Sequence, residues 1–221
     1  MPDFIERSLE TALTNCSRVG EMSIRRINGG GFVLSHCDDG GRDDLQCLQN
    51  PEEAVEIARY DDAGNYRPLK TAPNLRHGWR LELVDLGELR RALDYFYPGR
   101  FALFNAWKAN LLVTTTLRDT LNRQSGMYRV AAKISDEQVN QVVGDFCRSS
   151  DGCLRTILWK RDATGAPAST QLPPEKFDTS HDQTGDGEPV IPLLCQEPCN
   201  LLVAECRKAV KLEGAAPSAP E

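Results

Sequence analysis

The chain has 221 residues, a formal net charge of −6 and a hydrophobic fraction of 40%, values typical of an ordinary folded protein with one large or two small domains. The acidic balance argues against bulk attraction to nucleic acid or to an anionic membrane. The sequence has no apolar run of the roughly eighteen residues that a membrane helix needs, and its N-terminus lacks a secretion signal. We therefore expect a cytoplasmic protein that binds neither nucleic acid nor membranes.

The sequence predicts short helices that alternate with strand pairs. The clearest signal is a β-hairpin, because an Asn-Gly-Gly turn at 28–30 accepts positive φ and separates two stretches with strand composition. The elements expected in chain order are a helix over 3–16, strands over 22–27 and 31–36, a helix over 51–60, a strand pair around 66–70 and 77–84, helices over 86–97 and 101–111, a helix ending at 147, a strand over 153–160 and a helix over about 200–211.

An acidic loop follows the hairpin and raises the question of a calcium site. Its aspartates lack the ligand spacing of an EF-hand loop, and no glutamate stands at the twelfth position. A solvated loop is therefore the preferred interpretation, and His36, in the preceding strand, is interpreted as a packed side chain. The acidic residues are Asp38, Asp39, Asp43 and Asp44.

Four of the eight cysteines stand as two pairs in the last third of the sequence. Cys147 and Cys153 are separated by five residues, Cys195 and Cys199 by three, and no cysteine lies between the pairs. Because a reducing compartment keeps cysteines as thiols, metal binding is favoured over disulfides. Residues 135–138 form a capping box, which predicts the start of the helix that ends at Cys147 and places the first pair at a helix-to-strand corner.

This spacing suits an iron–sulfur cube better than a zinc ion. A [4Fe–4S] cluster needs four thiolates aimed at the corners of a wide body, with backbone amides pointing at its sulfurs, and short loops between paired cysteines supply both. Zinc prefers the tight C-x2-C knuckle, which the sequence lacks. Structural zinc, and cysteines that are unliganded or disulfide-bonded, stay open as alternatives. The predicted cluster ligands are Cys147, Cys153, Cys195 and Cys199.

The remaining cysteines have no partner spacing. Cys206 shares an apolar helical face with leucine and valine residues and is interpreted as a small buried side chain, with a replacement cluster ligand as the alternative. Cys16, Cys37 and Cys47 are interpreted as structural.

A polar stretch before the cysteine region has two interpretations. It is either a surface turn or a source of guanidinium donors that pair with the carboxylates of an anionic ligand such as a tetrapyrrole. The arginines considered as donors are Arg118, Arg123 and Arg129 of this stretch and Arg148, which follows Cys147.

These elements predict an α+β fold in which small antiparallel sheets pack with helices and the C-terminal part binds the cluster. We expect an α+β N-terminal part over 1–130 and a cluster-binding part over 131–212. The latter contains a long surface excursion over 162–190, and a disordered tail follows over 213–221.

The order of the paired cysteines resembles the ligand pattern of sirohaem-dependent sulfite and nitrite reductases. In that family the last thiolate also bridges to the macrocycle, which corresponds to Cys199 here. Those enzymes carry a Cys-Pro-Asn-Gly-Cys type of loop, whereas residues 195–199 of this chain read Cys-Gln-Glu-Pro-Cys, and the chain is short for enclosing sirohaem. The resemblance therefore extends to cluster ligation and not to catalysis.

A wider resemblance, from about Gly30 to Lys211, is to the C-terminal iron–sulfur region of long CbiX-like proteins, which are multidomain relatives of sirohydrochlorin and cobalt chelatases. This resemblance implies one [4Fe–4S] cluster on the four paired cysteines and a link to tetrapyrrole metabolism. The stretches that carry it are 61–70 (Asp-Asp-Ala-Gly-Asn-Tyr-Arg-Pro-Leu-Lys), 142–147 (Val-Val-Gly-Asp-Phe-Cys) and 194–199 (Leu-Cys-Gln-Glu-Pro-Cys).

The chelatase activity itself is not expected here. A CbiX-type catalytic site uses histidines to accept protons and to place the metal, whereas His36, His77 and His181 stand well apart in this sequence. We therefore do not assign metal insertion to this polypeptide.

Three functions stay open. The preferred one is a [4Fe–4S] redox or accessory protein of sirohaem- or cobalamin-type tetrapyrrole metabolism, whose partner is a redox protein or an enzyme of that pathway. The second is an enzyme that acts on a tetrapyrrole through the cluster, and the third is a zinc-stabilised interaction module. The sequence does not decide whether the protein is an enzyme, nor its oligomeric state or reduction potential.

Overall fold

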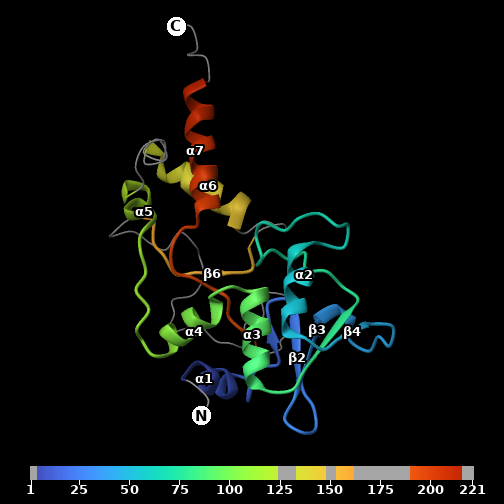
Figure 1. Ribbon diagram of the computed structural model, residues 1–221. Helices are drawn as coiled ribbons and strands as arrows, with labels where there is room; N and C mark the ends of the chain where they lie inside the picture. Colours follow the sequence, from blue (N-terminus) through green and yellow to red (C-terminus); the bar gives the residue numbers. More distant parts are fainter. Residues whose placement is uncertain (1–3, 124–132, 148–152, 162–189, 216–221) are drawn as a thin grey trace, which may run out of the picture. The chain divides into compact units, whose positions relative to one another are not determined.

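The computed structural model describes residues 4–123, 133–147, 153–161 and 190–215, which form two compact units (Figure 1). The N-terminal unit comprises the described residues up to Leu112 together with 190–193, and the C-terminal unit comprises those from Val113 and from Leu194 onward. The predicted boundary stood at residue 130, later in the chain. The surface excursion predicted over 162–190 falls, apart from Val190, outside the described residues.

The N-terminal unit is built on a six-stranded sheet with the order β4-β5-β3-β2-β1-β7. The pairs β1–β2, β2–β3 and β3–β5 are antiparallel, whereas β4–β5 and β1–β7 are parallel. The α+β class is thus confirmed, but the prediction of antiparallel sheets was wrong, because long crossovers lead into β5 and β7 and allow parallel pairing. The strands are β1 (Arg18–Val19), β2 (Met22–Arg26), β3 (Phe32–His36), β4 (Gln46–Leu48), β5 (Trp79–Leu83) and β7 (Val190–Ile191).

The predicted hairpin is confirmed. In the antiparallel register of β2 and β3, Ser23 lies opposite Ser35. Gly29 and Gly30 in the turn both have φ of 91°, a backbone conformation that glycine adopts without the steric cost of a Cβ atom. The turn residues therefore favour the register in which β2 pairs with β3.

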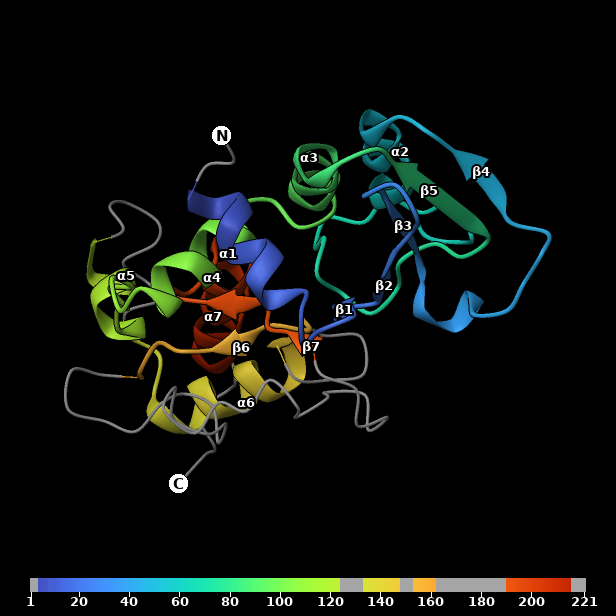
Figure 2. The same ribbon diagram turned by 90° about the horizontal axis from the view of Figure 1, so that it is seen from below.

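Helices pack around this sheet (Figure 2). α2 and α3 contact each other, α3 contacts β5, and α1 contacts both α3 and α4. The core includes Trp79 of β5 stacked on Phe96 of α3, with 5.1 Å between the ring centroids. The helical elements of this unit are α1 (Phe4–Ala12), the 3-10 turns η1 (Cys37–Asp39) and η2 (Pro51–Glu53), α2 (Ala54–Arg59), α3 (Leu86–Phe96) and α4 (Arg100–Lys108).

The second predicted strand pair is half right, because β5 forms but 66–70 is not a strand. That segment instead buries Arg67, a residue that is only 1% exposed. Its guanidinium donates hydrogen bonds to Asn74 Oδ1 at 2.7 Å and to the carbonyl oxygens of Ala58 and Ala72, both at 3.0 Å. A buried cation is tolerated here because protein acceptors replace its lost hydration.

The C-terminal unit packs helices against a short parallel strand pair. α6 and α7 lie side by side in both views (Figures 1 and 2). The strand predicted over 153–160 is shorter than expected and spans two residues. The elements are α5 (Leu117–Arg123), α6 (Asp136–Cys147), β6 (Thr156–Ile157), β8 (Leu194–Cys195) and α7 (Asn200–Ala215). The buried cluster that joins them contains Leu117, Leu121, Ile134, Val139, Val143, Ile157, Trp159, Cys195, Leu202, Val203 and Cys206.

α7 runs further than the sequence predicted. It ends at Ala215 rather than near Lys211, because leucine and glutamate, both good helix formers, follow Lys211 and the next proline is Pro217. The part of the predicted disordered tail beyond 215 lies outside the described residues. Neither α7 nor another helix of the described segments combines the length and the apolar character needed to cross a membrane.

The capping box before α6 is confirmed. The Gln138 N–H donates to Ser135 Oγ at 3.2 Å, and the Ser135 N–H donates to Gln138 Oε1 at 2.8 Å. We expect Ser135→Ala to lower the free energy of unfolding by about 1 kcal/mol, because an amide in the first turn of α6 loses its acceptor. Denaturant unfolding measures this change. Ser135→Thr keeps the hydroxyl and serves as the control, so an equal loss in both variants would contradict the capping explanation.

Candidate metal centre

Cys147 is the last residue of α6 and forms one side of the predicted site. Val139 and Val143 of the same helix are buried, which fixes the face that α6 turns towards the core. The Cys147 carbonyl accepts a hydrogen bond from the Cys153 N–H at 3.2 Å. One backbone hydrogen bond therefore holds the first pair of predicted ligands together, and 148–152 lie outside the described residues.

Cys195 lies on β8, opposite Ile157 of β6, and is 9% exposed. Its sulfur accepts a hydrogen bond from Trp159 Nε1–H at 3.3 Å, and its thiol donates to the Glu197 carbonyl at 3.2 Å. A buried indole N–H needs an acceptor, because indole donates only. For the fully buried Trp159 that acceptor is the cysteine sulfur, a contact that the sequence reasoning missed.

Cys199 immediately precedes α7 and caps its N-terminus. The Leu202 N–H donates to Cys199 Sγ at 3.4 Å, and the Val203 N–H donates to the Cys199 carbonyl at 3.1 Å. The partial positive charge at a helix N-terminus favours a thiolate over a thiol. The start of α7 is thus suited to hold an anionic sulfur.

The other three thiols lie close enough to Cys147 for their charges to act on it. Burial is the main cause that raises the pKa of Cys147 to about 12, and the charges of Cys153, Cys199 and Cys195 raise it further. Burial also raises the pKa of Cys195, against the hydrogen bond from Trp159, which lowers it. Because metal ligation requires thiolates, binding of a metal centre would release protons from these thiols. The predicted ligands share one neighbourhood, and their role as ligands stays a prediction.

The thiols are spaced more widely than in a zinc site. Tetrahedral zinc with Zn–S bonds of about 2.3 Å places its sulfurs about 3.8 Å apart. Within the described ranges, three metal-ligand atoms within 4.8 Å of one another occur in the N-terminal unit, and no three of the four paired cysteines form such a group. A cube whose thiolates bind separate irons fits this wider spacing, together with the N–H donors to Cys195 and Cys199.

The other cysteines differ in their surroundings. Cys206 is 1% exposed within the apolar core of the C-terminal unit, where burial raises the pKa of its thiol to about 11. This environment agrees with its interpretation as a packed side chain. Cys16 is buried, Cys47 is exposed, and Cys37 is partly buried beside His36 in the N-terminal unit.

The arginines considered for an anionic ligand are only partly described. Arg118 donates to the Ile134 carbonyl at 2.7 Å and to Asp136 Oδ1 at 2.8 Å, so these contacts occupy both terminal nitrogens of its guanidinium. Arg123 donates to the Asp119 carbonyl at 3.3 Å within α5. The two others, Arg129 and Arg148, lie outside the described residues.

Two domain families match the chain. The family described as a 4Fe-4S iron–sulfur cluster binding domain matches residues 109–208, and the family described as the DR2241 stabilising domain matches residues 7–110. The first match contains all four paired cysteines, and the cofactor of this domain is a [4Fe–4S] cluster. No curated protein matches the chain significantly.

A solved structure is similar to nearly the whole chain. The crystal structure of DR2241 from Deinococcus radiodurans matches with a TM-score of 0.71 and 29% sequence identity, over 95% of this chain and 42% of that protein. DR2241 is described as a multi-domain protein with structural similarity to chelatases and with two additional novel domains. This chain thus spans less than half the length of DR2241. The chain thus matches a DR2241 stabilising domain followed by a 4Fe-4S iron–sulfur cluster binding domain, which agrees with its resemblance to CbiX-like, chelatase-related proteins.

Proposed function

We propose that the chain acts as a [4Fe–4S] redox or accessory module of a chelatase-related protein. The observation that carries this proposal is the gathering of four thiols near the N-terminus of α7, inside the segment that matches a cluster-binding domain. When bound, the cluster supplies a centre for one-electron transfer. The proposed ligands are Cys147, Cys153, Cys195 and Cys199.

The surroundings of these thiols support an anionic cluster. Trp159 and the Leu202 amide donate hydrogen bonds to ligand sulfurs, and the N-terminus of α7 adds partial positive charge. Such donors offset the negative charge that four thiolates and an added electron bring into a buried site. The protein side chains thereby set how easily the centre accepts an electron.

The proposed link to tetrapyrrole metabolism is supported by the described similarity of DR2241 to chelatases. The partner we propose is a redox protein or an enzyme of that metabolism, and this chain supplies the cluster. An enzyme that itself binds a tetrapyrrole is the weaker candidate, because Arg118, one of the proposed carboxylate-binding residues, is already paired with Asp136.

Anaerobic purification followed by iron and sulfide analysis tests the proposal most directly. We expect close to four irons and four sulfides per chain, as the composition of the cluster requires. Electron paramagnetic resonance before and after dithionite then tests whether the centre accepts one electron. Colourless protein without iron would contradict the proposal, and a cluster that dithionite cannot reduce would remove the redox role while leaving an accessory role.

Trp159→Phe tests the influence of the indole donor. Because hydrogen bonds to the sulfurs favour the more negative, reduced cluster, we expect the variant to have a lower reduction potential at unchanged iron content. A potentiometric titration followed by electron paramagnetic resonance measures the shift. Trp107→Phe, a change in the N-terminal unit, is the matched control. Equal potentials for the two variants would show that the Trp159 bond does not act on the cluster.

A further inference from the structure

We propose that the N-terminal unit holds a second metal site, independent of the iron–sulfur cluster, that binds one divalent transition-metal ion such as Zn²⁺. The site lies where the end of β3 meets the turn η1, beside the residues that lead into β5. Nothing in it comes from the C-terminal unit. The proposed ligands are His36, Cys37, Asp38 and His77.

The sheet brings these residues together although they are far apart in sequence. β3 and β5 are antiparallel neighbours, with Ser35 opposite Arg80, so the residue after Ser35 lies near those that precede β5. The rings of His36 and His77 stand with their centroids 3.9 Å apart. Two imidazoles, a thiol and a carboxylate thus meet at one edge of η1.

Three of the four ligand atoms, from His36, Cys37 and Asp38, have nearly the spacing of a single ion. Cys37 Sγ lies 3.6 Å from Asp38 Oδ1 and 4.0 Å from His36 Nδ1. Asp38 Oδ2 lies 3.7 Å from His36 Nδ1 and 3.8 Å from His77 Nε2. A tetrahedral ion with bonds of about 2.0–2.3 Å places its ligand atoms about 3.3–3.8 Å apart. The atoms of His36, Cys37 and Asp38 therefore need only a small contraction to close around an ion. His77 lies outside this group of three and must move further to complete the site, from its present position beside Asp38.

Each imidazole also has a carboxylate on its far side. His77 Nδ1 lies 2.6 Å from Asp62 Oδ2, which leaves His77 Nε2 facing Asp38. His36 Nε2 is buried and lies 3.5 Å from Glu21 Oε1. Metal-binding histidines commonly direct their second ring nitrogen to a carboxylate, which fixes the tautomer and makes the ligating nitrogen more basic. His77 has that arrangement with Asp62, whereas His36 Nε2 lies near Glu21 without a hydrogen bond to it.

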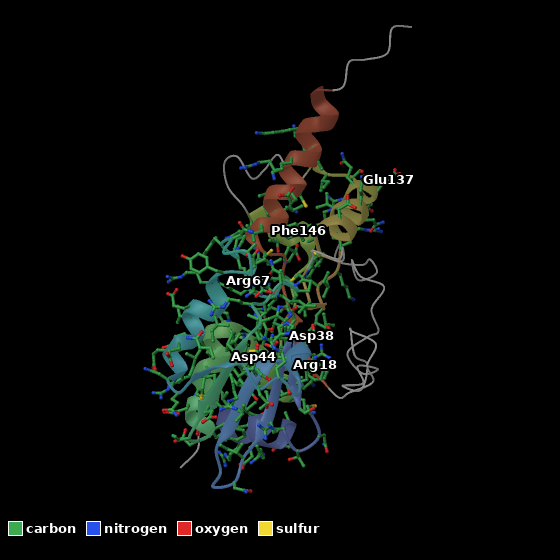
Figure 3. The ribbon with its side chains drawn as sticks, turned by 90° about the vertical axis from the view of Figure 1, so that its right-hand side faces the viewer. Arg18, Asp38, Asp44, Arg67, Glu137 and Phe146 are labelled. Atoms are coloured by element: carbon green, nitrogen blue, oxygen red, sulfur yellow. The ribbon has the colours of Figure 1, made fainter. Side chains whose placement is uncertain are left out.

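The charges and the exposure of the site agree with cation binding. Burial raises the pKa of the Cys37 thiol to about 11, against the charge of Arg18, whose Nη2 donates to Cys37 Sγ at 3.3 Å. Binding of an ion therefore releases the thiol proton. Arg18 and Asp38 are both labelled in Figure 3. The side chains of His77 and Asp38 are 40% and 76% exposed, so an ion reaches them from solvent. The Asp38 N–H donates to His36 Nδ1 at 3.1 Å, and ligation by His36 replaces that bond.

The mixture of ligands decides the class of metal. Imidazole and thiolate favour zinc and similar transition metals, whereas calcium takes six to eight oxygen ligands. Asp38 belongs to the acidic loop for which calcium was considered from the sequence, and its neighbours here are two nitrogens and a sulfur. The loop thus contributes one carboxylate to a softer site.

Calorimetric titration of the full, cluster-containing chain with ZnCl₂ under anaerobic conditions tests the proposal, with metal analysis of the product. We expect one Zn²⁺ per chain in addition to the iron. His77→Ala and Asp38→Asn change exposed side chains and should abolish detectable binding without unfolding the unit. Asp62→Asn keeps the ligands but removes the carboxylate on His77, and should weaken binding about 10–100-fold.

Matched controls come from the same unit. Cys47→Ser removes an exposed thiol and Asp43→Asn an exposed carboxylate, and both variants should bind Zn²⁺ as the parent does. No binding by the parent chain, or equal binding by the parent and the His77 and Asp38 variants, would overturn the site. Loss of Zn²⁺ binding in Cys147→Ser, with binding intact in His77→Ala, would place the ion on the cluster cysteines and also overturn it.

Discussion

Replacing any one of the four proposed ligand cysteines by serine is expected to remove most of the iron from anaerobically purified protein. An alcohol oxygen is a poor iron ligand compared with a thiolate, and a cube that lacks one protein ligand is exposed to solvent and oxidant. Iron and sulfide analysis, with the visible absorption of the cluster, measures the loss. The four variants are Cys147→Ser, Cys153→Ser, Cys195→Ser and Cys199→Ser.

Other thiols of the chain serve as controls for these variants. Cys47→Ser, at an exposed position of the N-terminal unit, should keep its full iron content. Cys206→Ala tests whether the buried thiol of α7 is needed as a ligand, and we expect its iron content to stay high because Cys206 packs in the apolar core. Full iron content in all four ligand variants would refute the assignment. If Cys206→Ala lost its iron while one of the four ligand variants kept its own, Cys206 would replace that cysteine as a ligand.

Arg67→Leu is expected to destabilise the N-terminal unit by about 4 kcal/mol, because several buried acceptors lose their donor at once. The guanidinium of Arg67 is bonded to Asn74 Oδ1 and to the carbonyls of Ala58, Lys70 and Ala72. Leucine fills part of the space but donates nothing. Urea unfolding followed by tryptophan fluorescence measures the change, since Trp79 is buried in the same unit.

Arg91→Leu is the control for Arg67→Leu. The Arg91 side chain is 56% exposed and lies 3.5 Å from Glu88, so its loss should change the free energy of unfolding by no more than about 0.5 kcal/mol. Similar urea midpoints for the two variants would show that the hydrogen bonds of Arg67 contribute little to stability. Iron content should persist in both, because the proposed ligands lie in the C-terminal unit.

Patterns within a few neighbouring residues gave the reliable parts of the sequence-based prediction. The Asn-Gly-Gly turn specified the hairpin of β2 and β3, and the capping box specified the start of α6. Both depend on contacts between residues close in sequence, which a single sequence displays. The spacing of the paired cysteines and the family resemblance also pointed to the [4Fe–4S] cofactor of the matched domain, while the ligand set stays a prediction.

Contacts between distant residues were beyond the reach of the same reasoning. The Trp159 donor to Cys195 depends on the pairing of β6 with β8, and the approach of His77 to His36 depends on the pairing of β3 with β5. Residues 66–70 read as a strand, but the hydrogen bonds of the buried Arg67 decide their path instead. No local pattern indicates which segments far apart in the sequence become neighbours in the fold.

The position of β7 late in the sequence also affects the order in which the protein folds during synthesis. β1, at Arg18, pairs with β7, at Val190, so the edge of the N-terminal sheet stays incomplete on the ribosome until that late segment emerges. Closing so long a loop is slow, and an unpaired strand edge attracts other nascent chains. Cys195 follows β7 closely in the sequence. Translation therefore delivers the last strand of one unit almost together with the second cysteine pair of the other.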